Sequence, residues 1–102
     1  MTQGDIYWYE DENTARRPFL VLTRSAAIAV LDRVVAAPLT TVIRDIATEV
    51  LLTTHDGVPR DCVVSADNIR LIERRRLSDR ITTLTPARMR EVCEAISFAI
   101  DC

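Results

Sequence analysis

The sequence predicts an α+β protein that is mostly β: a small, partly open barrel with a C-terminal helix. Seven short runs of apolar or β-branched residues are separated by turn signals, which is typical of a β-rich fold. After Thr85 the spacing of apolar residues changes to three and four, the period of a helix. With 102 residues, the chain has the length of one domain, so we expect residues 1–102 to fold as a single unit.

The first three strands are expected at residues 6–9, 18–23 and 33–40. Residues 6–9 are aromatic and β-branched, and Trp8 is expected in the core. Pro18 opens the second strand, a position where its missing N–H is tolerated. The third strand is nearly all apolar, so we expect both of its faces to be buried.

The later elements follow from shorter signals. Residues 25–28 favour a short helix, and the segment from His55 to Gly57 is typical of a turn. The remaining strands are expected at residues 49–52, 61–64, 69–72 and 80–84. A barrel of this size has little interior space, so any chemistry is expected in a surface groove or between subunits.

The terminal helix has a clear start. Thr85 is a good N-cap and Pro86 occupies the first helical position, where its missing donor costs nothing. One buried stripe is predicted from Met89, Val92, Cys93, Ile96, Ala99 and Ile100. We expect few apolar residues of the helix to remain exposed, and we expect dimerisation to add buried area.

Composition excludes several classes of protein. No apolar run approaches the roughly 18 residues that span a bilayer, and the N-terminal residues do not resemble a secretion signal, so we expect a cytoplasmic protein. The net charge of −2 argues against a generally basic nucleic-acid binder, yet all 13 cationic residues are arginines. Arginine offers a planar fork of donors that suits phosphate, although a GC-rich genome also produces this bias.

The metal-binding and nucleophilic residue types are sparse. Three scattered cysteines without CxxC spacing argue against a disulfide framework and a zinc site, so neither metal nor cofactor is expected. We expect these cysteines to be small buried or terminal residues. His55 is the only histidine and is expected in solvent, as are the carboxylate pairs Asp11–Glu12 and Asp45–Glu49.

Arginine and threonine side chains stand at the ends of two expected strands. Arg16 and Arg17 precede the second strand, and Thr40 and Thr41 end the third. A guanidinium and a hydroxyl at the rim of one sheet would together form a phosphate site. The pattern alone is a weak signal, because Arg-Pro and Thr-Thr are common pairs.

The order of several motifs resembles the MazF/PemK toxins over nearly the whole chain. The matching stretches are Gly-Asp-Ile-Tyr-Trp at 4–8, Arg-Pro-Phe-Leu-Val-Leu at 17–22, Val-Val-Ala-Ala-Pro-Leu-Thr-Thr at 34–41, Arg-Asp-Cys-Val-Val at 60–64 and Asp-Asn-Ile-Arg at 67–70. Arg76-Leu77 and the terminal helix complete the match. The first loop departs from the family pattern, since it is shorter and lacks the family's glycines.

The resemblance implies an SH3-like barrel of the CcdB/PemK type that forms a homodimer and cleaves single-stranded RNA without metal. Arg17 and Thr40 match the family's catalytic positions. Candidate RNA-binding residues are Glu12, Asn13, Arg16, Thr41, Arg70 and Arg74. A MazE-like antitoxin with a disordered acidic tail is the implied partner.

The implied chemistry uses the RNA's own 2′-OH as nucleophile and yields a 2′,3′-cyclic phosphate and a 5′-OH end. Arg17 would donate two hydrogen bonds to the phosphorane oxygens and Thr40 a third. Arginine holds its proton too tightly to be well matched to the role of general base, which stays unassigned. Two alternatives remain open: a CcdB-like gyrase poison and a non-catalytic protein-binding barrel of the same fold.

Overall fold

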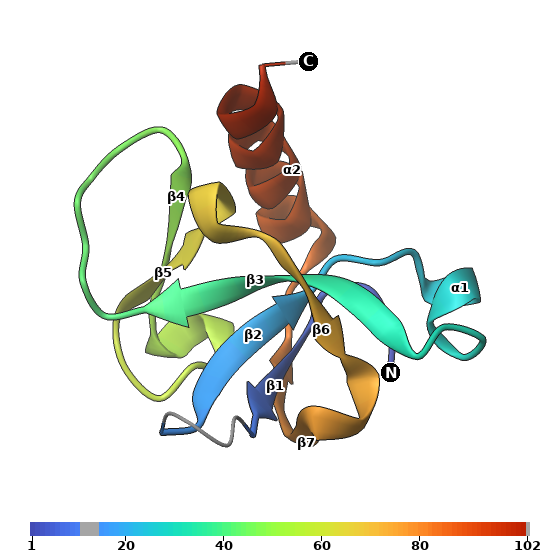
Figure 1. The fold of residues 1–102 in the computed structure, drawn as a ribbon. Helices are drawn as coiled ribbons and strands as arrows, with labels where there is room; N and C mark the ends of the chain where they lie inside the picture. Colours follow the sequence, from blue (N-terminus) through green and yellow to red (C-terminus); the bar gives the residue numbers. More distant parts are fainter. Residues whose placement is uncertain (11–14, 102) are drawn as a thin grey trace.

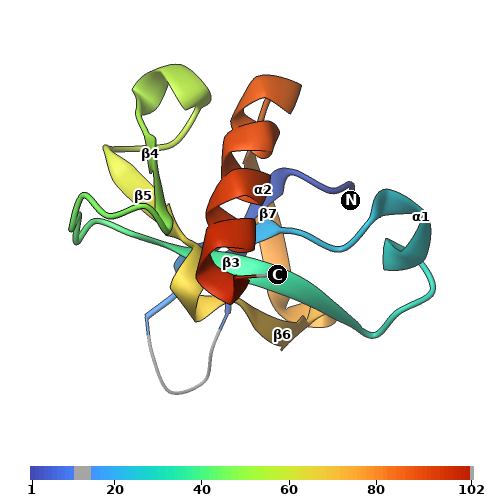
Figure 2. The same cartoon turned by 90° about the horizontal axis from the view of Figure 1, so that it is seen from above.

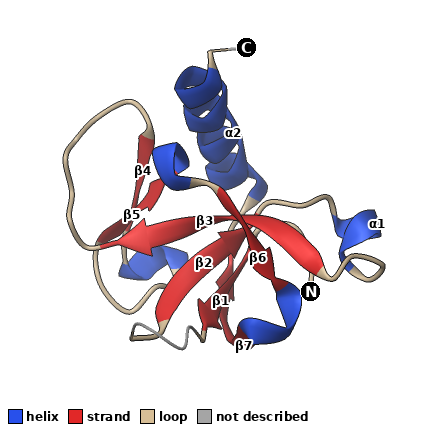
Figure 3. Cartoon of the chain, viewed as in Figure 1, coloured by secondary structure: helices blue, strands red, loops and turns tan. Residues whose placement is uncertain are grey.

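The computed structural model describes residues 1–10 and 15–101 of the chain, in which seven strands and a C-terminal helix follow the predicted order (Figures 1 and 3). The strands are β1 (Asp5–Tyr9), β2 (Arg17–Val21), β3 (Arg33–Thr40), β4 (Glu49–Leu52), β5 (Cys62–Ser65), β6 (Arg70–Glu73) and β7 (Leu77–Thr83). The helices are α1 (Ser25–Ile28) and α2 (Pro86–Ile100), and the 3₁₀ turns are η1 (Thr54–Asp56), η2 (Ala66–Asn68) and η3 (Arg74–Arg76).

All pairings between the strands are antiparallel. They run in the order β4-β5-β3-β2-β1-β7, and β6 pairs separately with β3. The path ends at β4 and β7, so the sheet curls without closing, which confirms the partly open barrel with a C-terminal helix. None of the helices among the described residues is long and apolar enough to cross a membrane.

Strand β3 is the centre of the sheet because it pairs with β2, β5 and β6. Its even-numbered residues Val34 and Ala36 pack with Phe19 in one apolar cluster, whereas Ala37 and Leu39 belong to a second cluster that α2 covers (Figure 2). Burial on both faces is therefore confirmed for residues 36–39, while the start of the strand is exposed on one face. The two clusters fill the interior on either side of β3.

Helix α2 begins as predicted, with the Thr85 hydroxyl accepting from the Arg88 amide at 3.3 Å and Pro86 in the first turn. Its contact stripe is narrower than predicted. Val92 is fully buried, but Cys93, the next residue and so about a quarter-turn away, is exposed. The prediction that Cys93 lies on the buried stripe was wrong, and so was the prediction that few apolar residues remain exposed, because Phe98 is 66% exposed and Ile100 59%.

Two strand-level predictions also needed correction. Strand β7 begins at Leu77 and not at residue 80, since the exposed Asp79 and Arg80 are tolerated on an edge strand that pairs with β1 alone. Trp8 is half-buried and not in the core. The Arg16 guanidinium lies 4.5 Å from the centre of its ring.

The connection between β4 and β5 is fixed to α2 and β7 by a small polar network. The Asp56 carboxylate accepts from Arg88 at 2.9 Å and from the Thr53 amide at 2.9 Å, and these bonds hold the pKa of Asp56 below its ordinary value. Gly57 follows with φ of +95°, and its position lies against Thr82 of β7. Glycine is needed here both for the backbone conformation and for the space.

Gly57→Ala is expected to destabilise the protein more than Gly4→Ala. Both glycines have φ near +95°, so each substitution carries a cost of about 1–2 kcal/mol for a left-handed alanine. A methyl group at Gly57 would also lie 2.8 Å from Thr82 Cβ, which adds an overpacking cost of about 1–3 kcal/mol, whereas at Gly4 the nearest atoms are 3.5 Å away. Urea denaturation measures both free energies of unfolding, and equal losses would contradict the packing argument.

Candidate active site

A groove of about 340 Å³ lies where β2 begins and β3 ends. Residues 17 and 19 of β2 and residues 38 and 40 of β3 line it, because alternate side chains of a strand share one face. Phe19 pairs with Pro38, and the same register continued by two residues sets Arg17 opposite Thr40. The loop after β3 and the β5–β6 connection supply the other walls, which are Val42, Arg44, Ser65, Asn68 and Arg70.

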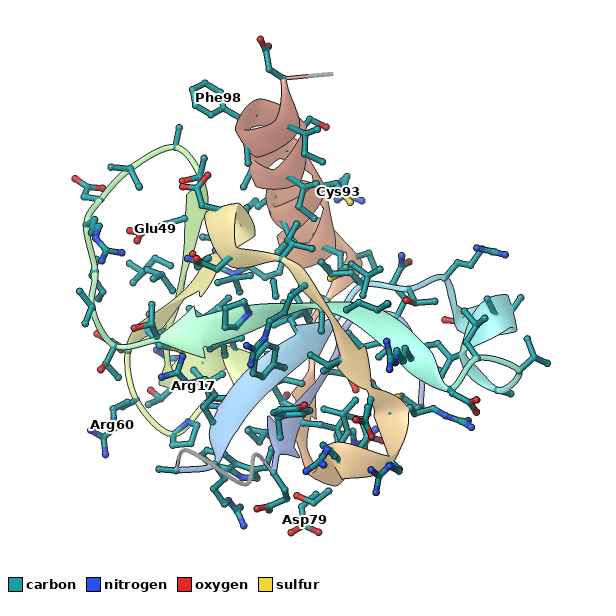
Figure 4. The ribbon with its side chains drawn as sticks, in the orientation of Figure 1. Arg17, Glu49, Arg60, Asp79, Cys93 and Phe98 are labelled. Atoms are coloured by element: carbon teal, nitrogen blue, oxygen red, sulfur yellow. The ribbon has the colours of Figure 1, made fainter. Side chains whose placement is uncertain are left out.

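Arg17 is the first residue of β2 and lies opposite Tyr9 of β1. Its side chain is exposed, and it makes no hydrogen bond or ion pair with any described residue (Figure 4). The five donors of the guanidinium are therefore available to a ligand in the groove. A planar fork at this position suits the non-bridging oxygens of a phosphate.

Thr40 ends β3 and is half-buried. Its Oγ1 accepts a hydrogen bond from the Val42 amide at 3.2 Å, which fixes the side chain at the mouth of the loop. Because this bond uses a lone pair, the hydroxyl hydrogen remains free to donate. Arg17 and Thr40 thus present donors to one groove from two neighbouring strands.

A second arginine lies over aromatic rings at the groove. The Arg70 guanidinium lies 4.9 Å from the ring centre of Phe19 and 5.9 Å from that of Tyr9. The two rings meet edge to face at 5.2 Å, and Phe19 is fully buried. Stacking of this kind restrains the guanidinium and leaves its N–H edges for hydrogen bonds. The structure therefore brings Arg70 beside Arg17 and Thr40.

The sequence reasoning missed Arg44, the third arginine of the groove. Glu49 holds the loop that carries it: the Glu49 Oε1 atom accepts from the Arg44 amide at 2.9 Å and from the Asp45 amide at 3.1 Å. Its other oxygen, Oε2, lies 3.9 Å from the Arg44 guanidinium and is buried without a hydrogen bond (Figure 4). The side chain of Glu49 is only 4% exposed, so the prediction that it is solvated was wrong.

Asn68 and Ser65 complete the wall, and they too were missed. The Asn68 amide donates to the Ser65 hydroxyl at 2.7 Å, which orients both side chains at the groove. The Asp-Asn-Ile-Arg motif at residues 67–70 was the available signal, because it places a polar side chain two residues before Arg70. Nothing local in the sequence indicated that the β3–β4 loop folds back to add Arg44.

The other expected RNA-binding residues are placed differently. Arg16 lies over Trp8 and forms an ion pair with Glu10 at 3.7 Å, and Thr41 lines a neighbouring hollow. Arg74 belongs to η3 and lines a separate hollow at the other end of β3, together with Arg33. Glu12 and Asn13 lie outside the described residues.

The electrostatics of the groove favour an anion. Its walls include three arginines: Arg17, Arg44 and Arg70. Glu49 forms an ion pair with one of them, Arg44. Over residues 1–10 and 15–101, no three side chains of His, Cys, Asp or Glu gather in a way that could hold a metal ion. The donors that the described residues place in the groove are guanidinium, hydroxyl and amide groups.

Comparisons with known proteins agree with this fold along the whole chain. A family model described as "PemK-like, MazF-like toxin of type II toxin-antitoxin system" matches residues 2–100. A Mycobacterium tuberculosis protein named "Probable endoribonuclease MazF5" is 40% identical over 101 residues, covering 98% of this chain and 93% of the relative. Another from the same species, "Probable endoribonuclease MazF2", is 37% identical over 103 residues and covers both chains completely.

Solved structures give the same result. The "Mycobacterium tuberculosis toxin MazF-mt6" superimposes with a TM-score of 0.87 at 34% identity, covering 95% of this chain and 96% of that one. An "Endoribonuclease in complex with its cognate antitoxin from Mycobacterial species" gives a TM-score of 0.89 at 30% identity, covering 99% and 95%. The open barrel and its groove thus place the protein among small β-rich toxins. The chain belongs to the PemK-like, MazF-like toxin family of type II toxin–antitoxin systems.

Proposed function

We propose that this toxin is an endoribonuclease that cleaves single-stranded RNA at short sequences without a metal ion, and that residues 1–102 act as one domain. The observation that carries the proposal is the meeting of Arg17 and Thr40 in one groove, beside Arg70. Relatives named as endoribonucleases match the chain over nearly its full length. A gyrase poison would require neither the arginine fork nor the hydroxyl at this position.

The reaction needs no nucleophile from the protein, because RNA supplies its own 2′-OH. The 2′ oxygen loses its proton and bonds to the adjacent phosphorus, and the bond from phosphorus to the 5′ oxygen breaks. The departing 5′ oxygen takes up a proton, which leaves a 2′,3′-cyclic phosphate and a 5′-OH. The protein must align these atoms and stabilise the charge on the five-coordinate phosphorus.

Arg17 and Thr40 stabilise the charge on the five-coordinate phosphorus. The guanidinium of Arg17, which pairs with no side chain of residues 1–10 or 15–101, donates two N–H bonds to the non-bridging oxygens, and the Thr40 hydroxyl donates a third. A guanidinium is a poor general base and a good donor to anionic oxygens, so Arg17 acts as an electrostatic clamp and not as the base. Arg70 and Arg44 hold the flanking phosphates, and Arg16, Thr41 and Arg74 are further RNA contacts.

The partner is an antitoxin whose acidic segment occupies the same groove. Three arginines lining one groove attract a carboxylate-rich tail as they attract a phosphate backbone. A neighbouring structure is a complex of an endoribonuclease with its cognate antitoxin. A segment that folds on binding would block Arg17 and Thr40 inside the cell until it is degraded.

The functional unit is a homodimer. Val35 and Leu71 pair across β3 and β6, and they are 39% and 57% exposed. They share the face of β3 that carries α2, because Val35 has the same parity as Ala37 of the cluster under the helix. Phe98 and Ile100 of α2 are further exposed apolar side chains. A second copy would bury these side chains.

Arg17→Ala and Thr40→Val are each expected to lower the rate of RNA cleavage by about 10²–10³, the usual cost of removing one preorganised donor. The matched controls are Arg17→Lys, which keeps the charge but loses the fork, and Thr40→Ser, which keeps the hydroxyl and should retain most activity. The assay is cleavage of a long single-stranded RNA in EDTA, with analysis of the product ends. Thermal unfolding confirms that the variants fold. Unimpaired cleavage by Arg17→Ala, or a requirement for added metal, would contradict the proposal.

Leu71→Glu is expected to convert the dimer to a monomer, because it places a charge in an apolar interface. Val30→Glu is the control, since Val30 is 78% exposed, follows α1 and lies outside this surface. Light scattering coupled to size-exclusion chromatography measures the mass of each variant. A parent protein that is monomeric at micromolar concentration, or a Leu71→Glu variant that stays dimeric, would rule out this interface.

A further inference from the structure

A second hollow of about 230 Å³ adjoins the groove, and its lining is mostly apolar. Trp8 and Pro18 pair directly across β1 and β2 and form one side of it, together with Leu39. Val58 and Pro59 from the β4–β5 connection form the other side. Flat aromatic and proline surfaces facing such a space suit a planar ring.

The interior of this hollow is uncharged. Cys62 lines it and is 5% exposed, and burial together with nearby Asp61 and Asp56 raises the pKa of its thiol to about 11. The thiol is therefore protonated at neutral pH and behaves as a small apolar group. The mouth is different, because the guanidinium of Arg16 lies 4.5 Å from the centre of the Trp8 ring and the exposed Arg60 lines the edge.

Thr40 connects the hollow to the groove, because it lines both. Arg17 and Phe19 line the groove, whereas Pro18, between them, lines the hollow. Because neighbouring residues of a strand point to opposite faces, the two spaces lie on opposite faces of β2, and both reach Thr40 at the end of β3. An extended RNA chain whose phosphate lies between Arg17 and Thr40 crosses the end of β3. A base next to that phosphate is therefore within reach of the hollow.

We propose that the hollow between Trp8 and Pro59 binds one unpaired nucleobase next to the scissile phosphate and that it sets the sequence preference of cleavage. The inference rests on the proposed ribonuclease function. A volume of about 230 Å³ is smaller than that of typical pockets for drug-sized ligands, roughly 300–1,000 Å³, and therefore admits a single ring system. The base stacks on Trp8, and Arg16 and Arg60 hold the phosphates on either side.

Trp8 is the only tryptophan of the chain, so its fluorescence reports directly on the hollow. The probe is an oligoribonucleotide that contains the mapped cleavage sequence and carries one 2′-deoxy sugar at the cleaved nucleotide, which prevents the reaction. Binding is expected to quench Trp8, and fluorescence anisotropy of an end label measures affinity independently. Replacing each base in turn by an abasic site should abolish the quenching at one position beside the scissile phosphate and weaken binding about tenfold or more.

Variants test the effect on specificity. Trp8→Ala should lower kcat/KM at the mapped site and reduce the preference at that one position, while Trp8→Phe should retain most of both because it keeps an aromatic face. Thermal unfolding checks that both variants fold. The readout is the change in preference at one position relative to the others, which general destabilisation would not produce.

Three results would overturn the inference. If the oligonucleotide binds by anisotropy but leaves Trp8 fluorescence unchanged, no base stacks on Trp8 in the hollow. If Trp8→Ala cleaves the same sequences with the parent's preference, the hollow does not set specificity, although the ribonuclease function stands. If the parent protein cleaves no RNA, the proposed function fails and this inference fails with it.

Discussion

The register of four adjacent strands determines the candidate site. Tyr9 pairs with Arg17, the β2–β3 register continued by two residues sets Arg17 opposite Thr40, and Thr40 pairs with Val63. A one-residue slip would turn every side chain of a strand to the opposite face, and the arginine and the hydroxyl would separate. At the start of β3, Val34 is fully buried and Val35 is 39% exposed, so a one-residue slip would expose a side chain that the core buries. The packing of the core therefore fixes the position of the phosphate groove.

The same alternation lets one pair of strand ends serve two purposes. Arg17 and Phe19 of β2 line the polar groove with its three arginines. Pro18, which lies between these two residues, lines the apolar hollow. Among the described residues, two apolar clusters fill the interior on either side of β3, and the candidate site lies outside them. A site on the outer edge of the sheet needs loops to complete it. The buried carboxylate of Glu49 holds the β3–β4 loop in place, and the contact between Asp56 and Arg88 holds the β4–β5 connection.

Local patterns in the sequence predicted the elements that depend on local chemistry. The bounds of β3, β4 and α1 and the start of α2 were correct, because β-branched runs, N-caps and helical periodicity are properties of neighbouring residues. Arg17 and Thr40 could be placed at strand ends from the order of motifs. Arg44 could not be placed in the groove from the sequence, because its loop is folded back by two hydrogen bonds from backbone amides to Glu49. Cys93 was misplaced because periodicity gives the direction of a stripe but not its width. Trp8 was misplaced because an aromatic side chain favours the core, whereas this one lines a hollow beside Pro18.

The central claim is that the nucleophile comes from the substrate and that the Arg17–Thr40 groove stabilises the charge that its attack creates. The most direct measurement compares two oligonucleotides that are identical except for one sugar, with ribose or 2′-deoxyribose at the cleaved nucleotide. The protein is expected to cut the first in EDTA, leaving a cyclic phosphate, and to leave the second intact although it binds both. Cleavage of the deoxy oligonucleotide at a comparable rate would show that water or a protein group attacks the phosphorus, and would contradict the mechanism.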